Sequence, residues 1–192
     1  MILVALGDSI TAGTPLWDPD PHVRVKIGDR LDERSSWVYW AASMQSGVEF
    51  RNHGVNLEKA EQVAARLEAA VIGADALVVQ SGVNDLVRGG TLEGAERDLR
   101  WMVRRADELG LRVSITELIP NNNFPELDKL IRELNRRIHA LAANEGIPVL
   151  PFYRTLEDRE RPGRIRPDWT NDGNHPSVEG HRRLGELAFR LP

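Results

Sequence analysis

Short apolar runs alternate with longer amphipathic segments along the 192-residue chain. A short continuous apolar run bounded by turn residues predicts a strand that is buried on both faces of a parallel sheet. Five such runs occur, at residues 2–6, 48–51, 76–80, 111–117 and 147–150.

The segments between these runs show the periodicity of helices. In residues 58–71, for example, Ala60, Val63 and Leu67 fall on one face at helical spacing, and Gly73 provides a stop. On the same grounds we expect helices at residues 37–45, 58–71, 92–109, 126–144 and 177–191.

The alternation of strands and helices predicts an α/β protein. Its sheet should be parallel, with helices on both faces and right-handed crossovers. The length fits a single domain over residues 1–192. Two polar stretches, residues 14–33 and 153–171, lack periodicity, and we interpret them as long loops that shape a functional mouth.

Composition narrows the possible functions. A net charge of −4 gives no sign of nucleic-acid binding, and the arginines are scattered among acids as on a solvated surface. The absence of cysteine excludes disulfides and thiolate chemistry, and no histidine pair has metal-ligand spacing. No apolar run is long enough to span a bilayer, and residues 1–6 do not form a signal peptide, so we expect a cytoplasmic protein. His22, His53, His139 and His181 are interpreted as structural or solvent-facing.

Polar residues with chemical potential follow the predicted strands. Ser9 follows the first strand, Gly54 the second, Asn84 the third, and Asp172 and His175 the fifth. Because the carboxyl ends of parallel strands line one edge of a sheet, we expect these residues to meet there.

Asp172 and His175 lie three residues apart, just before a predicted helix. Pro176 disfavours helical geometry in His175 and suits the first turn of a helix, which places His175 on a loop that leads into it. The carboxylate can bind Nδ1 and leave the other ring nitrogen free to take a proton from a nucleophile. The alternative is that Asp172 caps a turn and His175 packs at a helix start.

Ser9 lies in the segment Gly7-Asp8-Ser9-Ile10-Thr11, at a turn after a buried strand. Its hydroxyl can serve as a nucleophile and its backbone N–H as an oxyanion donor, or Ser9 can cap a helix instead. Gly54 allows its backbone N–H to approach a ligand, and the Asn84 amide can donate to an oxyanion, although both residue types also suit ordinary turns.

Further residues are candidates for support of the site or for the substrate rim: Asp8, Asn52, Asp85 and Trp169. Asp85 can orient Asn84, while Asn52 can either brace the Gly54 turn or cap a strand end. An acyl-transfer site needs a nucleophile, a base, an orienting acid and oxyanion donors, and this chain supplies each of them at a strand end.

Four blocks of the sequence resemble those of the GDSL or SGNH hydrolase superfamily: Gly7-Asp8-Ser9-Ile10, Asn52-x-Gly54, Gly82-x-Asn84-Asp85 and Asp172-x-x-His175-Pro176. The resemblance implies a flavodoxin-like, three-layer α/β/α fold, with Ser9 as nucleophile, His175 as base and Asp172 as its partner. It also implies an oxyanion hole made of the Ser9 N–H, the Gly54 N–H and the Asn84 side chain, with no metal or organic cofactor. Leu57 stands where many members carry a further glycine, so we expect the loop after Gly54 to be shaped differently.

We therefore expect a serine ester hydrolase that works through an acyl-enzyme. The polar stretches at 14–33 and 153–171 favour small soluble esters, such as short-chain acyl esters, aryl esters or acetylated carbohydrates, over long acyl chains. The alternatives are lysophospholipase or thioesterase activity, an acyltransferase, and a non-catalytic module that binds a carbohydrate or another small molecule. For Arg88 and Arg166 two interpretations remain: contact with an acidic group of the substrate at the rim of the site, or a place on the solvated surface.

Overall fold

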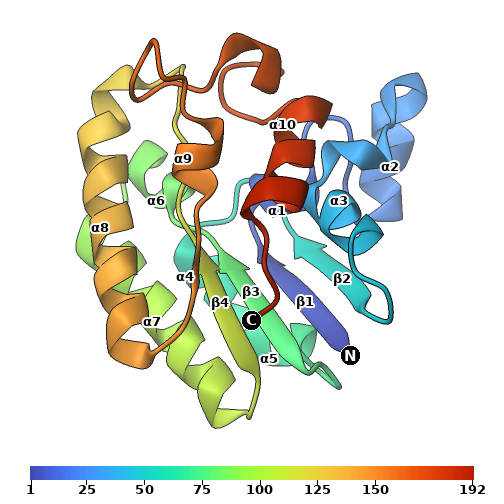
Figure 1. Cartoon of the computed structure of the whole chain (residues 1–192), viewed down its shortest axis with the longest axis vertical. Coiled ribbons are helices and arrows are strands. Elements are labelled where there is room, and N and C mark those ends of the chain that lie inside the picture. Colours follow the sequence, from blue (N-terminus) through green and yellow to red (C-terminus); the bar gives the residue numbers. More distant parts are fainter.

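A five-stranded, all-parallel sheet forms the centre of the computed structural model, which describes residues 1–192 (Figure 1). The strand order is β2-β1-β3-β4-β5, so the chain reverses its direction of winding after β2 and the switch point lies between β1 and β3. Ligands of such sheets bind beyond the carboxyl ends of the strands at this point. The strands are β1 (Ile2–Gly7), β2 (Glu49–Gly54), β3 (Ala76–Gln80), β4 (Arg112–Thr116) and β5 (Val149–Leu150).

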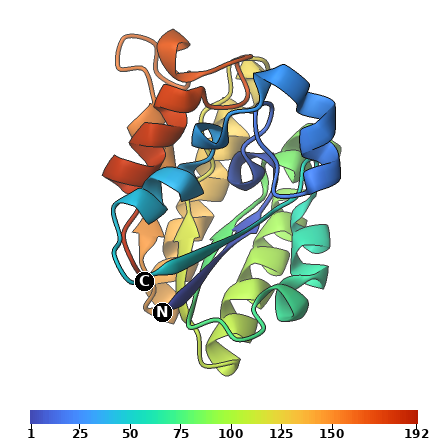
Figure 2. The same cartoon turned by 90° about the vertical axis from the view of Figure 1, so that its right-hand side faces the viewer.

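Helices cover both faces of the sheet and give the three-layer α/β/α fold (Figure 2). One face carries α3 (Trp37–Ser43), α9 (Phe152–Leu156) and α10 (Val178–Arg183), which continues into a π-helical turn at Leu184–Ala188. The other face carries α4 (Ala60–Ala65), α5 (Leu67–Ala70), α7 (Leu92–Glu108) and α8 (Asp128–Glu145). Three short helices remain: α1 (Ser9–Ala12), α2 (Pro21–Ile27) and α6 (Val83–Val87).

Alternating side chains of the central strands serve the two cores. In β1, Leu3 and Ala5 pack toward the α3 face, and Val4 and Leu6 pack toward the α7 face, all without solvent exposure. A strand that is buried on both faces needs apolar residues at every position, which explains why β1 reads as a continuous apolar run.

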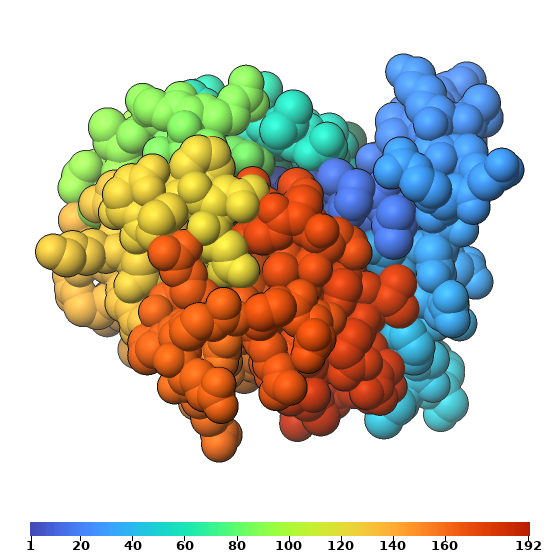
Figure 3. All heavy atoms as spheres, turned by 90° about the horizontal axis from the view of Figure 1, so that it is seen from above, coloured from blue at the N-terminus to red at the C-terminus, as the bar shows by residue number.

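The two stretches that we expected to be loops contain helices. In residues 14–33, Asp20 caps α2 through the His22 N–H and Pro21 occupies its first turn. No residue of α2 is buried, so the helix has no apolar periodicity to reveal it, and its segment projects from the rest of the molecule (Figure 3). In residues 153–171, α9 begins one residue before the stretch and buries Phe152 and Leu156 against the sheet.

Other boundaries also differ from the predictions. The helix expected at 58–71 is divided at Arg66, whose φ is −108° and whose guanidinium donates to Gly7 O and His53 O. The last helix ends at residue 188 rather than 191, and β2 continues to Gly54 instead of ending at residue 51. The short helix α6 was not predicted.

The amino and carboxyl termini lie near each other at the edge of the sheet where β1 begins (Figures 1 and 2). The loops that leave the carboxyl ends of the strands lie at the opposite edge. None of the helices is both long and apolar enough to cross a membrane.

Candidate active site

Ser9 is the first residue of α1, directly after β1 and beside the switch point of the sheet. Asp8 caps this helix, because its carboxylate accepts the Ile10 N–H at 3.0 Å. The N–H of a residue at the first helical position has no acceptor within the helix, so the Ser9 N–H is available to a ligand. Ser9 is buried, with 5% of its surface exposed.

Ser9, His175 and Asp172 are connected by hydrogen bonds. His175 Nε2 lies 3.2 Å from Ser9 Oγ, and His175 Nδ1 lies 2.7 Å from Asp172 Oδ2. A ring that donates from Nδ1 to a carboxylate presents Nε2 as an acceptor, which is the state that can take a proton from a serine hydroxyl.

Asp172 and His175 lie near the tip of a short antiparallel turn, here named the 169–177 hairpin. The hairpin is closed by the bridge between Thr170 and Pro176 and by the Thr170 hydroxyl, which donates to His175 O at 2.8 Å. Asp172 Oδ1 accepts the N–H groups of Asn174 and His175, both at 2.8 Å. Burial acts to raise the pKa of Asp172, but the bonds from the His175 ring and from these two N–H groups hold it below its usual value. The carboxylate therefore stays charged beside the imidazole.

Asn84 lies in α6, at the end of β3. Its Nδ2 donates one hydrogen to Glu58 O at 2.9 Å, which fixes the amide and leaves its second hydrogen for a ligand. Asp85 makes no hydrogen bond to the Asn84 side chain; its Oδ2 accepts the Ala60 N–H at 2.9 Å and so ties α6 to the start of α4. Burial raises the pKa of Asp85.

Gly54 does not have the free backbone N–H that we predicted. That N–H donates to Asn52 Oδ1 at 2.9 Å, so it is already satisfied within β2. Asn52 also donates to Thr11 O at 2.8 Å, and of the two roles considered it braces the Gly54 turn. A Cβ at Gly54 would overlap the backbone of Ala12, so the glycine is needed for the close approach of β2 to α1.

The turn after Gly54 carries an unusual backbone conformation. Leu57 has a φ of 67°, the only positive value outside the glycines, and its carbonyl accepts Arg88 Nη1 at 2.6 Å. Arg88 therefore supports this turn. The turn lies against Asn84, because Glu58 O is the acceptor of the Asn84 amide.

Asp8 is fully buried next to Ser9 in the chain, and its Oδ2 has no hydrogen-bond partner. Burial raises the pKa of this carboxyl to about 7. Asp8 therefore acts on Ser9 through the cap of α1, and its side chain does not form part of a substrate rim.

Trp169, which we predicted as a site residue, and Thr170, which we did not, both support the 169–177 hairpin. Trp169 supports the base of the 169–177 hairpin through its carbonyl, which accepts the Ser177 N–H, but its ring lies between Arg166 and Arg183. Thr170 was missed, although a Thr-Asn-Asp-Gly run is typical of a tight turn and could have indicated it.

His181 is the most deeply buried of the histidines that we interpreted as structural or solvent-facing. It is fully buried in α10, and burial together with the charge of His175 lowers its pKa to about 3. It is therefore neutral, and its role is structural.

The order of the sheet defines a flavodoxin-like, three-layer α/β/α protein, and the Ser9, His175 and Asp172 side chains are in contact near its switch point. The profile of the GDSL-like lipase/acylhydrolase family matches residues 5–183. The chain belongs to this family of hydrolases, as the four sequence blocks indicated.

Solved structures share the fold at low sequence identity. A G-D-S-L family protein from Desulfitobacterium hafniense is 23% identical, with a TM-score of 0.79 over 96% of this chain and 95% of that chain. A lipolytic G-D-S-L family member from Veillonella parvula is 22% identical, with a TM-score of 0.79 over 96% and 94%. A GDSL-like lipase from Bacteroides thetaiotaomicron is 23% identical, with a TM-score of 0.75 over 97% and 84%. None of the curated proteins compared with the chain matches it.

Proposed function

We propose that the protein is a serine esterase that hydrolyses small carboxylic esters. The observation that carries this proposal is the pair of contacts from His175, 3.2 Å to Ser9 Oγ and 2.7 Å to Asp172 Oδ2. Ser9 Oγ attacks the ester carbonyl while His175 Nε2 takes its proton. The imidazolium, stabilised by Asp172, gives that proton to the leaving alcohol, and water then hydrolyses the acyl-enzyme by the same route.

The oxyanion that forms on the carbonyl needs preorganised donors. The Ser9 N–H and the free hydrogen of the Asn84 amide supply two. The third donor belongs to the turn after Gly54 and not to Gly54 itself. In that turn the Val55 N–H donates to Gly7 O and the Glu58 N–H to Val55 O. The N–H groups of Asn56 and Leu57 have no such partner, and both residues shortly precede Glu58, whose carbonyl accepts the Asn84 amide.

Substrate size follows from the apolar surface near these donors. Val55 and Leu57, in the turn that contacts Asn84, are exposed by 42% and 56%. They offer contact to a short acyl group. The polar stretches at 14–33 and 153–171 add no continuous apolar stripe that would bind a long one. The tests below distinguish this esterase from a lysophospholipase or thioesterase, by acyl-chain length, and from a module that only binds small molecules, by labelling and hydrolysis.

Labelling by a fluorophosphonate tests the nucleophile. The wild-type chain should gain the mass of one phosphonyl group, and Ser9→Ala should gain none and lose p-nitrophenyl acetate hydrolysis by about 10³-fold or more. Ser43→Ala is the matched control, because Ser43 lies exposed at the end of α3, and it should label like the wild type. A wild-type chain that neither labels nor hydrolyses esters would show a binding module instead.

A further inference from the structure

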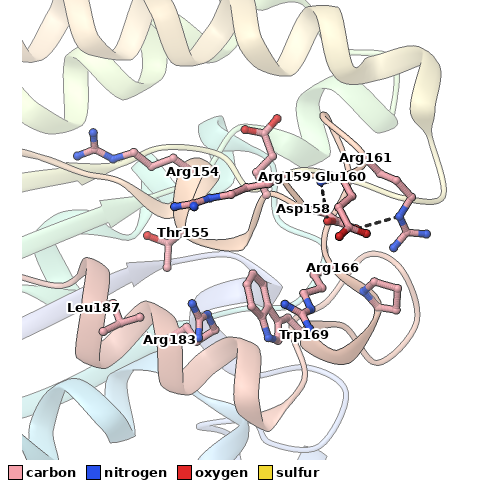
Figure 4. Close-up of a pocket in the computed structure, with 12 residues that line it drawn as sticks. Arg154, Thr155, Asp158, Arg159, Glu160, Arg161, Arg166, Trp169, Arg183 and Leu187 are labelled. Carbon is pink, nitrogen blue, oxygen red and sulfur yellow. Dashed lines mark hydrogen bonds and ion pairs between the residues drawn. The ribbon is translucent and has the colours of Figure 1, made fainter.

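A large cavity lies outside the Ser9 site. It encloses about 930 Å³ between α9, the loop at residues 157–169 and the end of α10 (Figure 4). None of Ser9, Asn84, Asp172 and His175 lines it. Trp169 connects the two regions, because its ring faces this cavity while its backbone forms the base of the 169–177 hairpin.

The cavity is cationic in a protein whose net charge is −4. Five arginines line it against three acids, and two of those acids are already neutralised. Asp158 is paired with Arg161 at 2.9 Å, and Glu157 is paired at 2.7 Å with Arg132, which lies outside the lining. Arg154 and Arg159 have no ion-pair partner in the structure.

Two of the arginines are held in place by Trp169. The guanidinium of Arg183 lies 4.0 Å from the centre of the indole ring and that of Arg166 lies 5.2 Å from it, on its two sides (Figure 4). Their carboxylate contacts are long, 3.8 Å from Arg183 to Glu179 and 3.5 Å from Arg166 to Asp168. Arg183 Nε is buried without any acceptor. Stacking therefore fixes these guanidinium groups and leaves their donors largely unused.

Guanidinium donors in fixed positions match the oxygens of a phosphate group, which they bind through paired hydrogen bonds. The volume is that of a pocket for a small molecule. Apart from Trp169, Pro167 and Leu187, its lining is polar, which does not suit a lipid chain. We propose that this cavity binds a phosphorylated small molecule through Arg159, Arg166 and Arg183.

Isothermal titration of the protein with sodium pyrophosphate tests the proposal. The wild type should bind one pyrophosphate with a dissociation constant below about 1 mM, and Arg159→Ala and Arg183→Ala should each weaken binding by about tenfold. Trp169→Phe should abolish any change of tryptophan fluorescence on binding. Arg159 is an exposed loop residue, so its variant tests the site without depending on the packing of α10.

Arg136→Ala is the matched control, because this exposed arginine lies in α8, pairs with Glu133 and does not line the cavity. Its dissociation constant should stay within about twofold of the wild-type value. Absence of saturable binding up to about 10 mM would overturn the proposal. An equal loss in Arg136→Ala and Arg159→Ala would overturn it as well, since it would show attraction by overall charge.

Discussion

At the scale of single residues, Asp8 combines a structural task with an unusual ionisation. One oxygen caps the helix that begins with Ser9, and the other is buried without a partner. The folded protein keeps the carboxyl protonated up to about pH 7, whereas an unfolded chain releases this proton near pH 4. Between these values the folded state binds more protons, so this group makes the free energy of unfolding fall as the pH rises, on the order of 1 kcal/mol per pH unit.

Asp8→Asn should remove this dependence, because the amide keeps an oxygen for the Ile10 N–H and carries no charge. We expect the fall in melting temperature from pH 5 to pH 8 to be smaller in the variant than in the wild type. Asp20→Asn changes the exposed cap of α2 and is the control. Its melting temperature should depend on pH as that of the wild type does. Superimposable curves for Asp8→Asn and wild type would show that Asp8 is ionised throughout.

Asn84 provides the test of the oxyanion hole at the same scale. Asn84→Ala should lower kcat for a p-nitrophenyl ester by about 10²–10³-fold with little change in KM, as expected for a donor used mainly in the transition state. Asn144→Ala, on the exposed side of α8, is the control and should keep the wild-type kcat. An unchanged kcat in Asn84→Ala would show that Asn84 is not an oxyanion donor and only makes a structural hydrogen bond to Glu58 O.

At the scale of elements, the approach of β2 to α1 positions Ser9, the nucleophile of the proposed reaction. Gly54 lies against the backbone of Thr11 and Ala12, and Asn52 donates to Thr11 O. Any Cβ at residue 54 would push α1 away from the strand and carry Ser9 with it.

Gly54→Ala should therefore destabilise the protein by about 3 kcal/mol, at the upper end of the cost of overpacking, and lower kcat as well. Gly94→Ala in α7 meets only the Thr91 hydroxyl and should change the free energy of unfolding by about 1 kcal/mol or less. Chemical denaturation of both variants measures the difference. Equal stability of the two would mean that β2 and α1 can move apart freely.

The strands buried in the sheet, and the residues that follow them, were the parts of the fold that the sequence predicted best. The strand at residues 76–80 was predicted with its observed bounds, because β3 is buried on both faces and therefore reads as continuously apolar. Ser9, Asp172 and His175 were expected to meet because all three follow strands of one parallel sheet, and their side chains do meet.

What escaped prediction depends on contacts across the fold. No residue of α2 is fully buried, so its apolar pattern is weak, and only its cap at Asp20 and Pro21 indicates it. The partner of the Gly54 N–H is a side chain two residues earlier, and sequence reasoning left the role of Asn52 open. The cationic cavity combines residues of α9, a loop and α10, which spacing along the chain does not bring together.

At the scale of the whole molecule, the stretches at residues 14–33 and 153–171 are rich in charge and proline and offer an acyl chain no continuous apolar stripe. Each CH₂ that is buried contributes about 0.8 kcal/mol, but a chain that stays in water gains little of this. We expect kcat/KM for p-nitrophenyl esters to be highest from acetyl to butyryl and to decline by octanoyl. A best substrate with an octanoyl or longer chain would favour a lysophospholipase or thioesterase in place of the small-ester enzyme.

The neighbouring termini have a practical consequence for engineering. Both ends of the chain lie at the edge of the sheet opposite the Ser9 site (Figures 1 and 2). A short peptide that joined them would give a circular permutant with new ends in an exposed loop, a rearrangement that proteins tolerate when their termini are close. An affinity tag at either end would attach the protein to a solid support with the edge that carries Ser9 directed toward the surrounding solution.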